Sequence, residues 1–171
     1  MARKIFKTQL CYLAIILLSC NSQQNSKTSR WLDDIQYDKK IDKKNFVVCD
    51  EDNVFQYFNL GDAIHYKGDK PMIINEFIAN YDSTKVKRES GLIRIRFIVN
   101  CEGETDRFRM MQSDLNYKEK VFDKNISDQL MAITKGLDGW GKKEKKDGTS
   151  VDYWQYLTFK IIDGKIVKII P

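Results

Sequence analysis

Few residues in this chain could carry chemistry. There is one histidine, His65, and there are four cysteines, so a metal site built from several histidines is excluded. The spacing of these residues suggests no nucleophile and base pair, and the chain has no glycine-rich phosphate-binding motif. Asp50, Glu51 and Asp52 could touch a cation, but consecutive residues do not converge like the alternating ligands of a calcium loop. We therefore expect a protein that is not an enzyme and has no metal site or cofactor.

A short apolar run near the start of the chain ends abruptly at a cysteine. The run covers residues 10–18, about half of the roughly 20 residues that a helix needs to cross a bilayer. Arg3, Lys4 and Lys7 precede it. This order of charged, apolar and small residues is typical of a secretory signal peptide, and cleavage would fall near Ser19. We expect a leader rather than a membrane span.

The residues at this point, "LLSC" at 17–20, resemble the lipobox of bacterial lipoproteins. The alternative is an ordinary secretory leader followed by an incidental cysteine. The resemblance implies a signal peptide over residues 1–19, diacylglycerol on the thiol of Cys20, and acylation of its new amine with a fatty acid such as palmitate. Two or more acyl chains hold a protein stably on a bilayer. The implied location is the periplasmic face of a membrane, the outer membrane rather than the inner.

The charge balance argues against a nucleic-acid partner. The whole chain has 29 basic and 24 acidic residues and a net charge of +5. The leader contributes three of the basic residues and none of the acidic ones, so the rest of the chain carries a net charge of only +2. Charges of both signs are interspersed, as on a soluble protein surface.

Two cysteines remain once the leader and the lipid attachment point are set aside. Cys49 and Cys101 form an even pair in a protein expected to be exported, so a disulfide is plausible. It would close a loop of about 50 residues and contribute about 4 kcal/mol in the chain-entropy model. The alternative is a pair of buried free thiols.

The composition along the chain predicts a tether followed by one domain. Residues 21–30 contain no apolar residue and are typical of a flexible spacer. Residues 31–45 are charged and could form a frayed helix or more linker. We therefore expect a lipidated tether over residues 20–45 and an ordered domain over residues 46–171. The sequence leaves open how residues 31–61 are folded.

Two amphipathic helices are predicted in this domain. Asp69 and Pro71 mark the start of the first, with Asp69 as its cap, and it should end near Tyr81. The second helix has an apolar stripe within residues 122–137. The apolar residues that share one face of the first helix are Ile73, Ile74, Phe77, Ile78 and Tyr81.

A β-hairpin is predicted between the two helices. The apolar residues at positions 93, 95, 97 and 99 alternate with Arg94, Arg96 and Ile98, which indicates a strand with one buried face. A polar turn follows, and the return strand covers about residues 105–112. Arg107 and Arg109 alternate with the apolar residues of the return strand. We expect these two arginines to lie on the solvated outer face rather than to bind a ligand.

A second hairpin is predicted at the end of the chain. Asp163 and Gly164 separate a strand at about residues 153–162 from a short last strand at residues 165–170. This dipeptide favours a type I′ turn, in which both central residues have positive φ. The order helix, hairpin, helix, hairpin predicts an α+β fold, a small antiparallel sheet packed against two helices.

Residues 62–171 resemble the C-terminal domain of TonB-type energy transducers, especially the divergent versions from Bacteroidetes-like bacteria. The resemblance lies in a strand motif, a helix leading to a tryptophan, a glycine loop and a last aromatic strand. The chain departs from the family where a proline is common, at Asp82 and Gly141. It has only two prolines, so it lacks the family's long proline-rich rod. The matching residues are Gly91, Ile93, Ile95, Phe97, Val99, Gly103, Leu130 to Ile133, Trp140, Gly148 and Phe159.

The resemblance implies binding by β-augmentation, in which a segment of an outer-membrane receptor adds a strand to the sheet. The matching strand carries the candidate partner edge, Trp154, Tyr156, Thr158 and Lys160. The last strand, 165–170, could occupy this edge and block docking. Alternatively, the last strand could be displaced by a partner.

The sequence thus favours a lipid-anchored, non-catalytic protein-binding module of the cell envelope. Its partner would be an outer-membrane receptor or an assembly partner, and the lipid would hold it on the membrane. One alternative is an energy transducer of TonB-dependent uptake, although no segment that could receive energy from an inner-membrane motor is visible. Another is a structural envelope lipoprotein that dimerises through its last strand. The oligomeric state stays open.

Overall fold

The computed structural model of the protein describes residues 35–56 and 64–170. The predicted leader, the lipid attachment point Cys20 and the tether up to residue 34 lie outside the described residues. The described part is an α+β domain with two helices and a mostly antiparallel sheet, as predicted.

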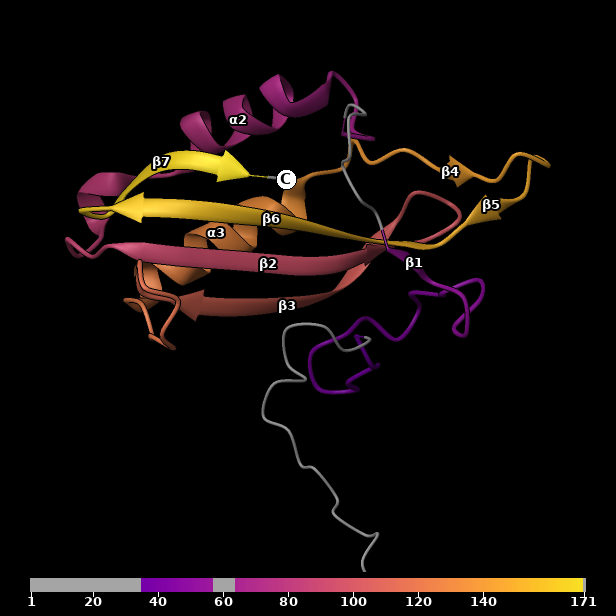
Figure 1. The fold of residues 1–171 in the computed structure, drawn as a ribbon, viewed down its shortest axis with the longest axis horizontal. Helices are drawn as coiled ribbons and strands as arrows, with labels where there is room; N and C mark the ends of the chain where they lie inside the picture. Colours follow the sequence, from indigo (N-terminus) through magenta and orange to yellow (C-terminus); the bar gives the residue numbers. More distant parts are fainter. Residues whose placement is uncertain (1–34, 57–63, 171) are drawn as a thin grey trace, which may run out of the picture. The chain divides into compact units, whose positions relative to one another are not determined.

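The main sheet has five strands (Figure 1). Its path is β1-β6-β2-β3, and β7 also pairs with β6. Every pairing is antiparallel except that of β1 with β6. A separate two-stranded sheet is formed by β4 (Lys143–Glu144) and β5 (Ser150–Val151). The strands of the main sheet are β1 (Phe55–Gln56), β2 (Gly91–Val99), β3 (Thr105–Ser113), β6 (Tyr153–Ile162) and β7 (Lys165–Ile170).

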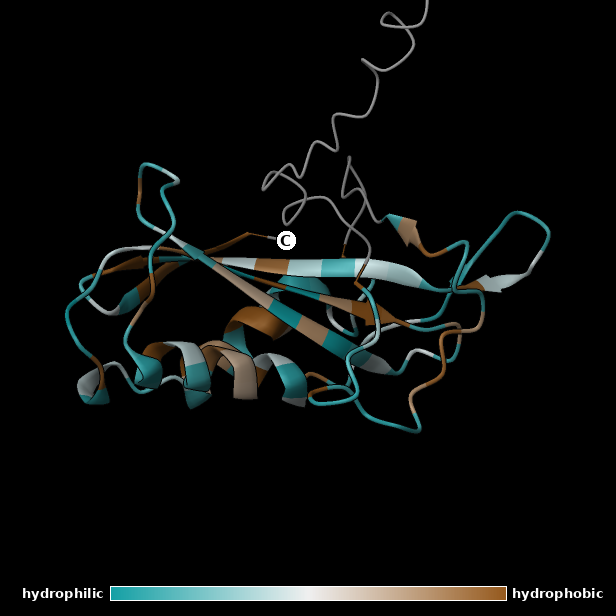
Figure 2. Cartoon of the chain, turned by 90° about the horizontal axis from the view of Figure 1, so that it is seen from below, coloured by the Kyte–Doolittle hydropathy of each residue, from teal (hydrophilic) through white to brown (hydrophobic). Residues whose placement is uncertain are grey.

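Both helices lie on one side of the main sheet (Figure 2). The first, α2, covers Asp69–Asn80, and the second, α3, covers Lys124–Gly136. A short 3₁₀ helix, Ser83–Lys85, follows α2. Asp123 caps α3, since its carboxylate accepts the N–H of Asn125. The other face of the sheet carries no helix among the described residues.

The start of α2 differs by one residue from the prediction. Gly68 is the cap, with φ of 76°, and Asp69 is already the first helical residue. The carboxylate of Asp69 accepts the N–H groups of Ile64 and Lys70. A left-handed cap favours glycine, so the carboxylate is free to fix the preceding loop instead.

The core lies between the helices and the sheet. Alternate residues of β2 and β6 point to this side, as the pattern of period two predicts. Phe77 of α2 and Phe159 of β6 have ring centroids 4.7 Å apart, a favourable distance for an aromatic pair. Residues with at most 1% of their surface exposed include Ile73, Phe77, Ile93, Ile95, Phe97, Ile126, Leu130, Leu157, Phe159 and Ile161.

The segment 35–56 packs against the opposite face of the sheet, at one end. Ile35 and Val48 form a second buried cluster with Ile98 of β2, and Trp154 packs beside it. The N–H of Lys43 donates a 2.7 Å hydrogen bond to the carboxylate of Asp106. The packed part of the chain therefore includes residues 35–45, which the sequence had assigned to the tether, because buried apolar and polar contacts hold them.

The return strand β3 contains an irregularity that the sequence did not predict. The pairing of β2 with β3 shifts between Arg96 and Ile98, and Arg107 has φ of 56°. An extra residue of this kind is a β-bulge, which turns a side chain away from regular alternation. Only 5% of Arg107 is exposed, so the prediction that it is solvated is wrong.

Candidate functional site

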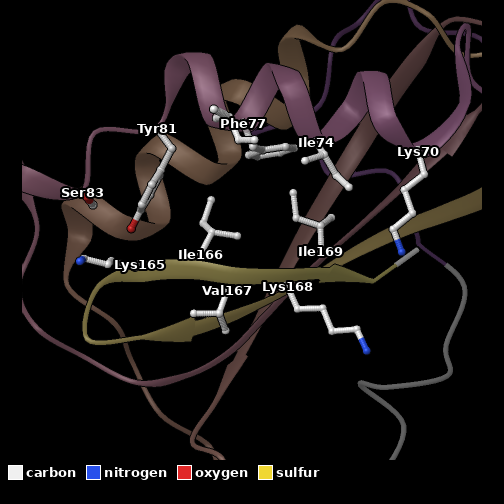
Figure 3. A pocket seen from close by; sticks show the side chains of 11 residues that line it. Lys70, Ile74, Phe77, Tyr81, Ser83, Lys165, Ile166, Val167, Lys168 and Ile169 are labelled. Carbon is white, nitrogen blue, oxygen red and sulfur yellow. The ribbon is translucent and has the colours of Figure 1, made fainter.

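An apolar groove lies between α2 and β7. It has a volume of about 600 Å³. Phe77 of α2 and Tyr81, the residue after α2, point toward it, and Ile166 and Ile169 point toward it from β7 (Figure 3). Phe77 and Ile169 also belong to the buried core, so well-packed atoms form the base of the groove. Such a preformed apolar surface can accept apolar side chains of a ligand.

The α2 side of the groove is an exposed apolar wall, and the ends of the groove are basic. Ile78 of α2 is 75% exposed, whereas the side chain of Val167 on β7 points away from α2 (Figure 3). Lys70 and Lys165 lie toward opposite ends (Figure 3). None of the described residues that line the groove is acidic. The groove therefore fits a ligand with an apolar middle and negative ends.

The strand β7 borders this groove with a free edge. It pairs with β6 on one side. Within residues 35–56 and 64–170, no main-chain hydrogen bond joins its other side to a partner. The unpaired N–H and C=O groups of such an edge can accept another strand. The edge offers 6 residues for pairing.

Tyr81 ties the helix to the last hairpin at one end of the groove. Its hydroxyl donates a 2.8 Å hydrogen bond to the carbonyl oxygen of Gly164, in the turn between β6 and β7. Burial raises the pKa of Tyr81 to about 12, because the phenolate would be poorly solvated there. The hydroxyl therefore stays protonated, and remains a donor, at neutral pH.

The predicted partner edge does not lie at a free edge. β6 is an interior strand, with β2 paired along one side of it. On its other side, β1 pairs at Trp154 and β7 pairs at Thr158 and Lys160. Tyr156 lies between these two pairings. The last strand thus covers the expected docking edge, as the hairpin at residues 163–164 suggested, and the free edge belongs to β7.

Comparisons of this chain with known proteins find no relative. No family model, no curated protein and no solved structure matches it. The resemblance to the TonB-type domain therefore rests on the sequence motifs alone, and the function has to be argued from the geometry of the chain itself.

The predicted disulfide between Cys49 and Cys101 is present. It joins the segment before β1 to the turn between β2 and β3, and their Cα atoms are 6.2 Å apart. The bridge holds the segment 35–56 on the sheet.

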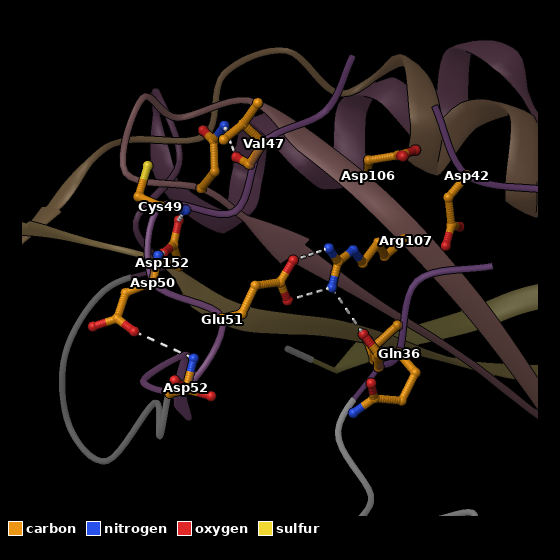
Figure 4. A network of polar contacts seen from close by, with 12 residues as sticks. Gln36, Asp42, Val47, Cys49, Asp50, Glu51, Asp52, Asp106, Arg107 and Asp152 are labelled. Atoms are coloured by element: carbon orange, nitrogen blue, oxygen red, sulfur yellow. Dashed lines mark hydrogen bonds and ion pairs between the residues drawn. The ribbon is translucent and has the colours of Figure 1, made fainter. Parts of the chain in front are cut away.

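A buried carboxylate supports this disulfide (Figure 4). Asp152, 1% exposed, accepts the N–H groups of Cys49 at 3.1 Å, Cys101 at 2.9 Å and Asp50 at 2.8 Å. The two sulfur atoms and this carboxylate lie close enough to share a metal ion. However, the sulfurs are bonded to each other and so offer no thiolate ligands. Asp152 thus serves as a main-chain acceptor that positions both cysteines.

Two ion pairs attach the segment 35–56 to β3. The guanidinium of Arg107 donates to both carboxylate oxygens of Glu51 (Figure 4). Arg109 donates to both oxygens of Asp42, each at 2.7 Å. Burial alone raises the pKa of Asp42, but its bonds to Arg109 and to the N–H of Asp38 hold that pKa below the usual value.

The acidic run before β1 has structural partners. Glu51 pairs with Arg107, and Asp50 accepts the N–H of Asp52 and the side-chain amide of Asn53. These carboxylates therefore do not converge on one point. The ring of His65 lies 2.6 Å from the carbonyl oxygen of Lys142, which ties the loop before α2 to the chain after Trp140.

The remaining predicted site residue, Cys20, lies outside the described residues. In the described part of the chain, no helix is long and apolar enough to cross a membrane.

Sequence reasoning missed the groove, although α2 carries a signal for it. The apolar positions predicted to share one face span too wide an arc for a single buried face. Ile73 and Phe77 are buried, whereas Ile78 is 75% exposed. A surplus apolar residue at the border of an amphipathic helix can therefore indicate a second apolar surface.

Proposed function

We propose that this protein is a lipid-anchored, non-catalytic protein-binding module of the bacterial cell envelope. In this proposal, an extended segment of an envelope partner adds to the free edge of β7, and its alternate side chains enter the groove beside α2. The observation that carries the proposal is the direct adjacency of a free strand edge and an apolar groove.

β-Augmentation suits this arrangement because it separates affinity from specificity. Main-chain hydrogen bonds to the edge strand bind any extended segment, and pockets for every second side chain select among segments. The 6 residues of β7 correspond to a length of about 20 Å. A segment of about six residues would therefore fill the site.

The charges around the groove favour a partner other than a second copy of the chain. Lys70 and Lys165 at its ends attract acidic residues of a bound segment. Self-pairing through β7 would bring Lys165 and Lys168 of two copies into the same small sheet. Lysines on an edge strand commonly prevent such pairing. We infer that the partner segment has an apolar centre and acidic ends.

The envelope location is part of the same proposal and rests on the N-terminal sequence. A lipid on Cys20 would keep the domain close to a bilayer, and the polar residues 21–30 would let it reach a neighbouring membrane protein. The disulfide between Cys49 and Cys101 supports an oxidising compartment such as the periplasm.

Binding of a defined peptide tests the docking proposal. The probe is a fluorescent peptide in which valine and serine alternate between two terminal glutamates, and fluorescence anisotropy measures its affinity. We expect a version with lysines in place of the glutamates to bind at least tenfold more weakly. Equal affinity of the two peptides, or no binding of the first, would contradict the proposed site.

A matched pair of variants locates the binding site. Ile78→Glu places a negative charge on the exposed wall of the groove and should weaken binding at least tenfold. Val121→Glu is the control, because Val121 is 82% exposed and does not line the groove. Equal effects of the two variants would place the peptide elsewhere. Intact mass of the protein from the membrane fraction separately tests cleavage before Cys20 and acylation of its thiol.

A further inference from the structure

The face of the sheet opposite the helices carries a cluster of basic residues, of which the proposed function uses only Lys168. Arg94 and Arg96 of β2 alternate with the core residues Ile93, Ile95 and Phe97, so they point to this other side. Lys160 of β6 and Lys168 of β7 lie on the same side, because they pair in register with each other and Lys160 pairs with Leu92. We call Arg94, Arg96, Lys160 and Lys168 the basic face.

Two of these cations face each other across a strand pair. Lys160 lies directly opposite Lys168 in the hairpin of β6 and β7. Both are exposed, and neither takes part in an ion pair within the described residues. Like charges directly opposite each other destabilise a sheet. Edge protection accounts for Lys168, but it does not account for Lys160, which lies on an interior strand.

The arginines of the basic face are held in place by β6. The guanidinium of Arg94 lies 4.8 Å from the ring centroid of Tyr156, and its Nε donates a 3.1 Å hydrogen bond to the hydroxyl of Thr158. The guanidinium of Arg96 lies 5.2 Å from the ring centroid of Trp154. These contacts leave the terminal nitrogens of Arg94 without a partner among the described residues. A guanidinium held in this way can donate a pair of hydrogen bonds to a phosphate.

Arg94, Lys160 and Lys168 have no acidic neighbour on the strands that carry them. The positions of β2, β6 and β7 on this side include no aspartate or glutamate in the described residues. The next cation along the sheet, Arg109, is already paired with Asp42. The four cations are spread over three strands rather than gathered around one cavity. This spread fits an extended anionic surface better than a single small anion.

Exposed aliphatic residues adjoin the lysines of this face. Figure 3 shows Val167 and Lys168 pointing away from α2. Ile170, which pairs with Thr158, is 37% exposed and Val167 is 55% exposed. Basic and aliphatic side chains together are typical of protein surfaces that rest on the boundary between headgroups and acyl chains.

We propose that the basic face docks on the surface of an anionic phospholipid bilayer. The phosphates of the headgroups would lie against Arg94, Lys160 and Lys168, and would relieve the repulsion between the two lysines. The side chains on the helix side of the groove, such as Phe77 and Ile78, lie outside this docking surface and stay available to a partner. The docking does not depend on the lipid at Cys20, although an acyl anchor would raise the local concentration of the bilayer.

Vesicle binding tests this inference on the full chain with Cys20→Ser, which removes the acylation site. Co-sedimentation is measured with vesicles of phosphatidylcholine alone and with vesicles that contain phosphatidylglycerol. Each basic side chain near an anionic bilayer strengthens binding about fivefold. The triple variant Arg94→Gln, Lys160→Gln, Lys168→Gln should therefore bind anionic vesicles about a hundredfold more weakly. Added salt should also weaken the binding of the protein with the intact basic face to these vesicles.

A control variant separates position from net charge. Lys67→Gln, Lys118→Gln, Lys146→Gln removes three exposed lysines outside the basic face and should weaken binding less than fivefold. The N-terminus is the same in all variants, so it does not affect the comparison. Equal losses in the two triple variants, equal binding to neutral and anionic vesicles, or tighter binding to single-stranded DNA than to the vesicles would overturn the proposal.

A single substitution keeps the test valid if the triple variant does not fold. Lys160→Gln should weaken vesicle binding about fivefold and, at the same time, raise the melting temperature, because it removes the repulsion from Lys168. If Lys160 had only a structural role, its replacement would not both weaken vesicle binding and raise the melting temperature. A lower melting temperature together with unchanged vesicle binding would contradict the inference.

Discussion

The hydroxyl of Tyr81 donates a hydrogen bond of 2.8 Å to the carbonyl oxygen of Gly164. This single contact joins the end of α2 to the turn of the last hairpin. It therefore sets the spacing of the two walls of the groove at this end. A specific polar contact thus ties α2 to the last hairpin, in addition to the packing of Phe77 against Phe159.

Replacing Tyr81 by Phe tests the role of this contact. The variant keeps the ring but leaves the carbonyl of Gly164 without its donor, so the free energy of unfolding should fall by about 1 kcal/mol. Peptide binding in the groove should weaken as well, because α2 and β7 are no longer tied. Urea denaturation and anisotropy measure the two effects. An unchanged free energy of unfolding would show that this hydrogen bond makes no net contribution to stability.

The raised pKa of Tyr81 predicts a loss of stability at alkaline pH. Burial raises this pKa from 10.0 to about 12 in the folded protein. Between these values the unfolded chain releases the proton more readily, so the free energy of unfolding falls as the pH rises from about 10 toward 12. Tyr81→Phe should lack this component. The measurement is the difference between the two proteins in stability as a function of pH, and a constant difference would contradict the prediction.

Asp152 should be more important for stability than its solvent-exposed neighbours. Asp152→Asn places an amide among the N–H groups of Cys49, Cys101 and Asp50, which need an acceptor. We expect a loss of about 2–4 kcal/mol in the free energy of unfolding, and slower formation of the disulfide during oxidative refolding. Asp52→Asn, at an exposed carboxylate, is the control. Similar losses in both variants would argue against the supporting role of Asp152.

The pair of Asp42 and Arg109 predicts acid sensitivity of residues 35–48. The pKa of Asp42 is lowered in the folded protein by Arg109 and by the N–H of Asp38, which together outweigh the effect of burial. A lowered pKa contributes stability above the unfolded value near 3.8, and this contribution is lost as the pH falls below it. Asp42→Asn should therefore be less stable than the unmodified chain at pH 7, and the difference should shrink at pH 3. An equal difference at both values would contradict this.

The regular elements could be predicted from the sequence because their signals are local. The alternation of apolar residues predicts β2 and β6, and the dipeptide at residues 163–164 predicts the last turn. Asp163 and Gly164 have φ of 49° and 77°, as a type I′ turn requires. The glycine at position 91, which begins the strand motif, also has a local reason, because a Cβ atom there would lie only 2.2 Å from the carbonyl oxygen of Ser113.

The parts that could not be predicted depend on contacts between distant residues. The burial of Arg107 follows from a bulge and from Glu51, 56 positions away. The packing of residues 35–45 follows from Arg109 and Asp106, and a charged segment with few apolar residues gives no local signal for it. The free edge at β7 depends on the order of the strands, which alternation alone does not determine.

Amide hydrogen exchange tests most directly whether a partner segment pairs with β7. The exchange of residues 165–170 is measured with and without the peptide that alternates valine and serine between two glutamates. We predict that the peptide slows exchange in β7 and leaves the exchange of β3, at the opposite edge of the sheet, unchanged. Bound peptide with unchanged exchange in β7, or with protection only in β3, would contradict the account.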